Sequence, residues 1–209
     1  MAFIRAHTAV SCAPLVPEIR LHLASEITPI WQATEDWLQR AGIEPPFWAF
    51  AWPGAQALAR RVLDEPALVR GRVVLDFAAG CGLAAIACAL AGARAEAAEI
   101  DPMATAAVGL NAALNGVAVR GTAQDVVGQA CRWDLILCGD VCYEAPMTGH
   151  ILPWLRAMAR TAEVWLADPG RAYLPSEHLA ELARYDVPTT IELEDRPLRT
   201  TRIFRLLPG

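Results

Sequence analysis

The chain has 209 residues and a formal net charge of −5, and 55% of its residues are hydrophobic while 20% are charged. This balance is typical of a folded protein of about one domain, and it excludes a disordered chain. The acidic balance disfavours a general nucleic-acid-binding protein, and no stretch approaches the roughly 20 apolar residues of a membrane span. We therefore expect a single domain over residues 1–209, located in the cytoplasm.

Six cysteines and four histidines are scattered along the chain, without the paired spacing of a disulfide framework or of a metal site. We expect free thiols, a reducing compartment and no bound metal. All 18 basic residues are arginine. The chain therefore has no side-chain lysine of its own.

The first third of the chain is expected to be a cap in front of the core. Residues 1–17 contain two prolines and are expected to be irregular, whereas apolar residues recur at roughly helical spacing over residues 18–40. The connector over residues 45–53 is unusually aromatic, and a helix is expected over residues 54–63. We therefore predict that residues 1–70 form a helical cap with an aromatic linker.

The next 30 residues have the pattern of a cofactor site. A short apolar strand ends at Asp76, a loop of small residues contains Gly80 and Gly82, an alanine-rich helix is expected over residues 83–90, and a second strand stops at Glu99. This succession predicts a site at the carboxyl edge of a doubly wound α/β sheet, formed by residues 71–209.

The remaining elements repeat the strand–helix unit and then change character. Helices are expected over residues 102–115, 146–158 and 176–184, and strands over residues 117–119, 133–138 and 164–167. The tail is β-rich, and strands over residues 187–193 and 200–206 are expected to form an antiparallel hairpin with a short turn at residues 194–197.

Two cofactors compete for the glycine loop. Residues 80–85 satisfy the dinucleotide pattern G-x-G-x-x-G/A, and Glu99 stands at a suitable distance for a ribose, so an NAD-dependent oxidoreductase is one alternative. Asp76, however, would face a diphosphate unfavourably. It suits a cationic group better, such as the ammonium of S-adenosylmethionine.

S-adenosylmethionine gives each polar residue of this region a partner. Gly80 and Gly82 let the backbone approach the ligand, Glu99 accepts hydrogen bonds from both ribose hydroxyls, and Asp125 contacts the adenine amino group. Asp76 lies near the ammonium end of the ligand. An alternative for Asp76 is a carboxylate that only caps the following helix.

Three motifs together resemble a known superfamily. The order D-x-A-x-G-x-G at residues 76–82, A-E-I-D-P at residues 98–102 and G-D-V-C-Y at residues 139–143 resembles the seven-β-strand S-adenosylmethionine-dependent methyltransferases. The resemblance covers residues 15–207. It implies a Rossmann-like sheet of order 3-2-1-4-5-7-6 with strand 7 antiparallel. Ala78 departs from the pattern, because many relatives carry glycine there, but its methyl group is small.

Three further stretches narrow the resemblance to the protein-lysine branch, and most closely to the electron transfer flavoprotein β-subunit lysine methyltransferases. They are the aromatic residues 46–54, D-V-C-Y at residues 140–143 and D-P-G-R at residues 168–171. The resemblance implies methyl transfer to lysine of a protein partner, the flavoprotein β-subunit. Methyl transfer to another protein or to a small molecule, the oxidoreductase, and a scaffold that only binds a partner remain alternatives.

The resemblance also implies roles for individual residues. Asp140 and Tyr143 are the expected catalytic pair: Asp140 accepts a hydrogen bond from the substrate amine and borders the cofactor, and Tyr143 forms an aromatic wall. Trp52 is expected at the cofactor, and Trp48 and Trp52 either line its channel or pack under the cap. The D-P-G-R turn ending at Arg171 either shapes the acceptor entrance or is simply a turn.

Overall fold

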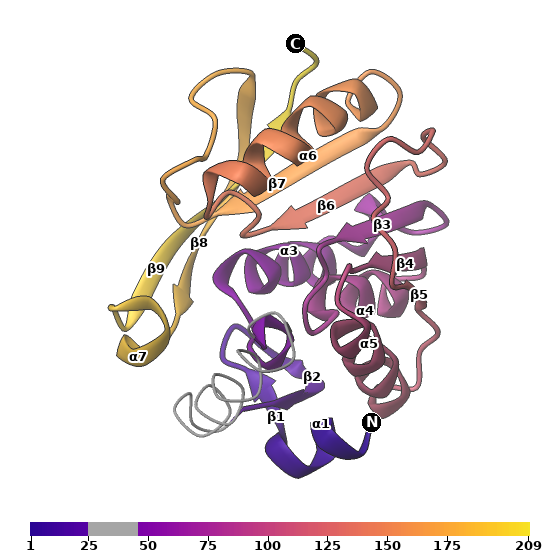
Figure 1. The fold of residues 1–209 in the computed structure, drawn as a ribbon, viewed down its shortest axis with the longest axis vertical. Helices are drawn as coiled ribbons and strands as arrows, with labels where there is room; N and C mark the ends of the chain where they lie inside the picture. The colour runs from indigo at the N-terminus through magenta and orange to yellow at the C-terminus, as the bar shows by residue number, and fades with distance from the viewer. Residues whose placement is uncertain (25–45) are drawn as a thin grey trace.

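The computed structural model describes residues 1–24 and 46–209, and a seven-stranded sheet runs through its centre (Figure 1). The sheet has the order β5-β4-β3-β6-β7-β9-β8. Its strands are β3 Val73–Phe77, β4 Arg94–Ala98, β5 Arg120–Thr122, β6 Leu135–Gly139, β7 Glu163–Asp168, β8 Leu179–Pro188 and β9 Leu198–Leu206. β9 is antiparallel to both neighbours, while the five strands from β5 to β7 are parallel. Numbered from β3, this is the predicted order 3-2-1-4-5-7-6, which is confirmed.

The helices of the core also follow the sequence closely. They are α3 Pro53–Asp64, α4 Leu83–Leu90, α5 Pro102–Leu114 and α6 Ala145–Met158, with short 3-10 turns at η1 Phe47–Ala49 and η2 Pro66–Leu68. α5 shows why such starts are predictable. The Asp101 side chain accepts a hydrogen bond from the Met103 N–H at 2.7 Å, and Pro102 occupies the first turn, where a missing N–H costs nothing.

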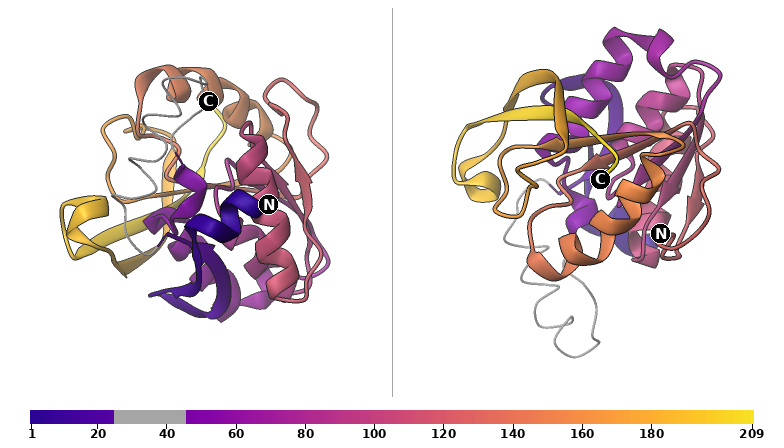
Figure 2. Two further views of the ribbon diagram at one scale, coloured as in Figure 1. Left: turned by 60° about the horizontal axis from the view of Figure 1, so that its bottom comes forward. Right: turned by 90° about the horizontal axis from the view of Figure 1, so that it is seen from above.

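The central strand β6 is buried on both faces, and this explains the layers. In β6, Leu135 and Leu137 belong to the apolar cluster under α3, α4 and α5, whereas Ile136 and Cys138 belong to the cluster under α6. Because successive side chains of a strand point to opposite faces, a strand that is apolar throughout has to be covered on both. Figures 1 and 2 show α6 on one side of the sheet and the other three helices on the opposite side.

The amino-terminal prediction was wrong for the residues that the structure describes. Residues 2–23 form the short helix α1 Ala2–His7 and an antiparallel hairpin of β1 Ala9–Ala13 and β2 Val16–Leu23, so residues 1–17 are not irregular and residues 18–23 are not helical. The rest of the helix predicted over residues 18–40 lies outside the described residues. The cap therefore begins with a β-hairpin.

Contacts with α5 explain why β2 is extended. The backbone N–H of His22 donates to the Asn111 Oδ1 atom at 2.7 Å, and that of Arg20 donates to the Asn115 Oδ1 atom at 2.9 Å. Two side-chain amides, about 90 residues away in sequence, thus satisfy the edge of the hairpin. Local spacing could not reveal this partner.

The tail was predicted only in part. The antiparallel hairpin is confirmed, but β8 Leu179–Pro188 replaces the helix expected over residues 176–184, and the short helix α7 Ile191–Glu194 lies where a strand was expected. β5 also begins at Arg120, later than the strand predicted over residues 117–119. Pairing with β9 along its whole length overrides the weak helical pattern of β8.

Two glycines allow α3 to approach the end of the sheet. A Cβ atom on Gly54 would lie 2.5 Å from both the Ala167 carbonyl oxygen and an Asp140 carboxylate oxygen, and one on Gly139 would lie 2.8 Å from the Ala55 nitrogen. Real Cβ atoms do not approach so closely. Glycine is required at both positions because the backbones of α3, β6 and β7 meet there.

We predict that Gly54→Ala lowers the free energy of unfolding by about 3 kcal/mol, because the added methyl group overpacks a site walled by backbone. The matched control is Gly109→Ala on the exposed face of α5, where a Cβ atom meets nothing within 4 Å. That change should be neutral or stabilising by up to about 1 kcal/mol. Urea unfolding of both variants measures the difference, and equal stabilities would contradict the close packing at Gly54.

Candidate functional site

A cavity of about 580 Å³ opens at the carboxyl ends of β3, β4 and β6. It is at the edge of the sheet where the sequence placed a cofactor site. Seven of the nine predicted site residues line it: Trp52, Ala78, Gly80, Glu99, Asp125, Asp140 and Tyr143. The other two, Asp76 and Gly82, lie next to this group in sequence but outside the wall of the cavity.

The loop between β3 and α4 is wound in the left-handed region. Ala78, Gly80 and Gly82 have φ angles of 54°, 53° and 78°. Ala78 adopts this conformation with a Cβ atom, at a cost of about 1–2 kcal/mol. Gly82 is the N-cap residue of α4, and a Cβ atom there would lie 3.0 Å from the Val108 side chain. The loop therefore turns its backbone, and no bulky side chain, towards the cavity.

Glu99 ties this loop to the end of β4. Its Oε1 atom accepts a hydrogen bond from the Gly80 N–H at 2.6 Å. Burial raises the pKa of Glu99 above its ordinary value, and the hydrogen bond from Gly80 partly offsets that rise. The Glu99 carboxylate is thus a hydrogen-bond acceptor held at a partly buried position beside the glycine loop.

Asp76 is buried under the same loop and does not reach the cavity. Its Oδ2 atom accepts a hydrogen bond from the Ala85 N–H in the first turn of α4 at 2.8 Å. Burial raises the pKa of Asp76 from 3.8 to about 8, against the Ala85 hydrogen bond and with a further contribution from the Glu99 charge. This is the helix-capping arrangement considered as the alternative, and contact with a ligand ammonium stays a prediction.

The raised pKa of Asp76 makes stability depend on pH. The folded protein keeps this proton up to about pH 8, whereas the unfolded chain releases it near pH 4. The free energy of unfolding therefore falls as the pH rises across that interval. Asparagine has no such proton. The stability of Asp76→Asn relative to the parent should therefore rise from pH 4 to pH 8, on the scale of about 1.4 kcal/mol per unit of pKa, and then stay constant. Urea unfolding between pH 4 and pH 9 tests this; a difference that does not vary with pH would show that Asp76 ionises normally.

Asp125 has a partner that the sequence did not reveal. Its Oδ2 atom lies 2.9 Å from the His150 Nε2 atom, and its Oδ1 atom accepts from the Val127 N–H at 2.9 Å. Partial burial acts to raise the pKa of Asp125, but the contacts with His150 and Val127 outweigh it and lower the pKa. Both Asp125 and His150 line the cavity. They are 25 residues apart, so spacing gave no signal of the pair.

Asp140 lies at the far side of the cavity, directly after β6. Its φ is 56°, in the left-handed region, and its side chain is almost fully buried. The Oδ2 atom accepts a hydrogen bond from the Gly54 N–H at 2.5 Å, and the Oδ1 atom from the Arg171 Nη2 atom at 2.9 Å. Burial raises the pKa of Asp140 to about 7, although the neighbouring Arg171 guanidinium opposes the rise.

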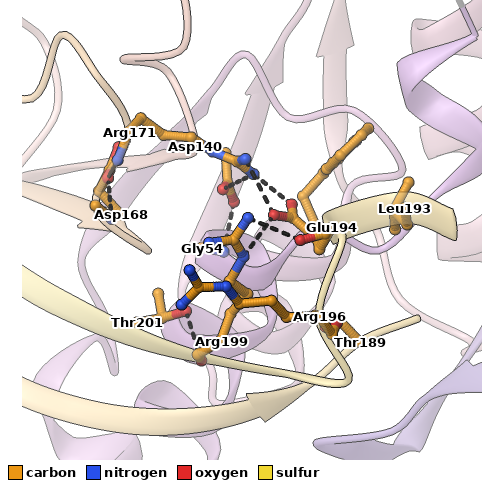
Figure 3. A network of polar contacts seen from close by, with 12 residues as sticks. Gly54, Asp140, Asp168, Arg171, Thr189, Leu193, Glu194, Arg196, Arg199 and Thr201 are labelled. Atoms are coloured by element: carbon orange, nitrogen blue, oxygen red, sulfur yellow. Dashed lines mark hydrogen bonds and ion pairs between the residues drawn. The ribbon is translucent and has the colours of Figure 1, made fainter. Parts of the chain in front are cut away.

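A row of alternating charges continues from Asp140 into the protein (Figure 3). Arg171 contacts Asp140 on one side and Glu194 on the other, where its Nη2 and Nη1 atoms lie 2.5 and 3.1 Å from the two carboxylate oxygens. Glu194 is fully buried and also accepts a hydrogen bond from the Arg199 Nε atom at 3.0 Å. Glu194 and Arg199 were missed in the sequence, because both lie in or next to what was expected to be a plain hairpin turn.

Aromatic side chains cover the cavity from the linker side. The Trp52 Nε1 atom donates to the Phe47 carbonyl oxygen at 2.9 Å, and the Phe47 and Tyr143 rings lie 5.7 Å apart. Trp48 is buried in an apolar cluster with α5 and also lines the cavity. Trp48 thus packs under the cap and borders the site at once.

Residues 1–24 and 46–209 contain no cluster of three His, Cys, Asp or Glu side chains that could hold a metal ion. No helix in the described part of the chain has the length and apolar character needed to cross a membrane.

The chain is similar to known methyltransferases. Residues 57–139 match the family of ribosomal protein L11 methyltransferases (PrmA). The electron transfer flavoprotein beta subunit lysine methyltransferase of Xenopus laevis is 38% identical over 219 residues, with 99% of this chain and 87% of that protein covered. The Homo sapiens protein of the same name is 35% identical, with 99% of this chain and 82% of that protein covered.

A solved structure shares the fold. Magnesium protoporphyrin IX methyltransferase from Synechocystis PCC 6803, with bound S-adenosylmethionine, has a TM-score of 0.54 and 16% identity, over 86% of this chain and 93% of that chain. At that identity the similarity establishes the Rossmann-like architecture and no more.

Proposed function

We propose a function on the premise that the chain belongs to the electron transfer flavoprotein beta subunit lysine methyltransferase family, to which relatives at 31–38% identity over nearly its whole length assign it. The proposed reaction is the transfer of a methyl group from S-adenosylmethionine to a lysine side chain of a protein. The proposed protein is the electron transfer flavoprotein β-subunit. The observation that carries the proposal is the cavity, because one wall suits the nucleoside and the other suits an amine.

The cofactor wall fits S-adenosylmethionine. The cavity volume is within the range of about 300–1,000 Å³ that is usual for small-molecule sites. Gly80 leaves its surroundings open, since a Cβ atom there would meet only the Phe47 carbonyl oxygen at 4.0 Å. Glu99 supplies an acceptor-only group for ribose hydroxyls, and Ala98 and Val126 supply apolar surface for a base. When bound, S-adenosylmethionine supplies a methyl group on a sulfonium that is already activated for displacement.

The acceptor wall suits a lysine amine. The ordinary pKa of lysine is about 10.4, so the amine arrives protonated and has to release its proton to water before its lone pair can attack. Asp140 accepts a hydrogen bond from the amine and directs its lone pair. The Tyr143 and Phe47 rings provide faces that tolerate a cationic or methylated amine. The protein's contribution is therefore alignment and exclusion of water.

The cofactor assignment predicts a specific loss of affinity. Glu99→Gln should weaken S-adenosylmethionine binding by about 10- to 150-fold, because one charge-assisted hydrogen bond is worth roughly 1.5–3 kcal/mol. Glu96→Gln is the control: this residue lies on β4, three residues before Glu99, and contacts Arg132 and Trp133 outside the cavity. Calorimetry with S-adenosylmethionine and with NAD measures both. Binding of NAD in place of S-adenosylmethionine would favour the oxidoreductase.

The reaction itself is tested with labelled S-adenosylmethionine and purified electron transfer flavoprotein. Label should appear on lysine of the β-subunit, and Asp140→Asn should lower the rate about 100-fold while leaving cofactor affinity nearly unchanged. Asparagine tolerates the left-handed backbone at this position, so the substitution tests the charge. Because the chain has no side-chain lysine, a signal on lysine belongs to the target.

The matched control is Asp134→Asn at the amino end of β6, where the carboxylate accepts from the Val73 N–H at 2.8 Å. It should retain the parent rate. Label on RNA or on a metabolite in a lysate would contradict the protein-lysine assignment, and full turnover by Asp140→Asn would contradict the role of Asp140.

A further inference from the structure

We infer that Arg171, clamped by Glu194 of the β8–β9 connection, is a positioning residue that keeps Asp140 ionised and aimed at the acceptor amine. This inference rests on the proposed function for the identity of the amine. It adds a segment more than 50 residues after Asp140 in sequence to the acceptor site.

The geometry makes Arg171 a bridge between two carboxylates. Its Nη2 atom lies 2.9 Å from Asp140 and 2.5 Å from Glu194, and its side chain is about 20% exposed, with part of it in the cavity wall. A planar guanidinium held on both sides has little freedom to rotate. The position of the Asp140 carboxylate is therefore fixed through Arg171 as well as through the Gly54 N–H.

Glu194 is in turn held from two directions. The short helix α7 starts at Thr190, whose hydroxyl accepts a hydrogen bond from the Leu193 N–H, and ends at Asp195 in a left-handed conformation. Arg199 on β9 donates to both the side chain and the carbonyl oxygen of Glu194. A fully buried carboxylate costs several kcal/mol unless it is paired, so its placement between two arginines is required for folding in this arrangement.

The backbone of Arg171 is fixed too. Asp168 is buried, and its Oδ1 atom accepts from the Gly170 N–H at 2.7 Å and from the Arg171 N–H at 2.6 Å. The D-P-G-R stretch is therefore a turn, and this turn delivers Arg171 to the acceptor side of the cavity. The turn considered from the sequence is confirmed, and a role in shaping the acceptor entrance stays a prediction.

The charges around Asp140 determine whether its carboxyl group is ionised. The Arg171 guanidinium, in the turn after β7, and the Gly54 N–H, in α3, both favour the ionised form of Asp140. The charge of Asp168 at the end of β7 opposes ionisation. The nearby Cys142 thiol stays protonated, because burial raises its pKa to about 12. Burial alone would leave Asp140 protonated, and its O–H would then donate a hydrogen bond to the lone pair of a neutral amine and occupy it. Arg171 is the neighbouring cation that offsets burial.

Arg171 also acts on the substrate amine. A lone carboxylate at the acceptor end would stabilise the ammonium form, which cannot attack a methyl group. A carboxylate already paired with a guanidinium attracts the ammonium less, because the pair has no net charge. The pair thus orients the amine while favouring its neutral, nucleophilic form.

The test is a direct titration of Asp140 in the cofactor-free protein. The carboxyl ¹³C signal of Asp140 is assigned with Asp140→Asn and followed by NMR against pH. In Arg171→Met we expect the titration midpoint to rise by roughly 1–3 pH units, the usual effect of losing an adjacent arginine. In Arg199→Met we expect a smaller rise, because Glu194 loses half of its clamp. Arg72→Met, which removes a half-buried contact with Glu163 at the opposite edge of the sheet, should leave the midpoint unchanged.

Arg171→Met leaves Glu194 with one partner and risks unfolding. The double variant Arg171→Met/Glu194→Gln removes the Arg171 cation together with the buried Glu194 carboxylate that it pairs with. The titration midpoint of Asp140 should rise in this variant as well. An unchanged midpoint in a folded Arg171 variant would overturn the inference. The same titration stands even if the methylation assay on the flavoprotein fails, because it requires neither cofactor nor substrate.

Where methylation is observed, kinetics give a second reading. The acidic limb of the kcat/KM profile of Arg171→Met should move to higher pH together with the NMR midpoint, while cofactor affinity stays within about twofold of the parent. A uniform loss of rate without any shift of the limb would mean that Arg171 only supports the fold, and would also overturn the inference.

Discussion

The account depends on one buried contact, the carboxylate of Asp140 held between the Gly54 N–H and the Arg171 guanidinium. An isolated carboxylate at this depth would not stay ionised, so its charge has to be compensated by its neighbours. α3 can reach the carboxylate only because residues 54 and 139 have no side chain. The turn after β7 and the β8–β9 connection provide the cation and hold it in place.

In the proposed function the cavity has a cofactor end and an acceptor end, and the residues of these two ends are distributed differently along the chain. The cofactor end is built from one continuous stretch, from β3 through the glycine loop and α4 to β4. The acceptor end collects residues from α3, β6, the turn after β7 and α7. Residues of one continuous stretch have a fixed spacing in the sequence, so their pattern can be recognised before the structure is known. Residues from separate elements come together only when the sheet forms, so the sequence contains no spacing that identifies them.

This difference explains what could be predicted. The loop from Asp76 to Glu99 and the order of the parallel strands followed from hydrophobic runs, glycines and the resemblance to a family. Asp140 was found because the resemblance to a family points to it and because it directly follows a buried strand. Glu194 and Arg199 could not be found, because Glu194 matters through its contact with Arg171, 23 residues before it, and Arg199 matters through its contact with Glu194. The errors have a related cause: β2 and β8 are extended because each pairs with a neighbouring strand, and β2 is also bonded to the amides of α5, so tertiary contacts override the local helical spacing.

A crystal structure with S-adenosylhomocysteine and a peptide that carries the target lysine tests the central claim most directly. The account predicts the ribose at Glu99 and the lysine nitrogen within hydrogen-bonding distance of Asp140, with the contacts from Asp140 to Arg171 and to Gly54 retained. A lysine nitrogen bound elsewhere in the cavity, or an Asp140 side chain turned away from Arg171 to reach it, would contradict the account.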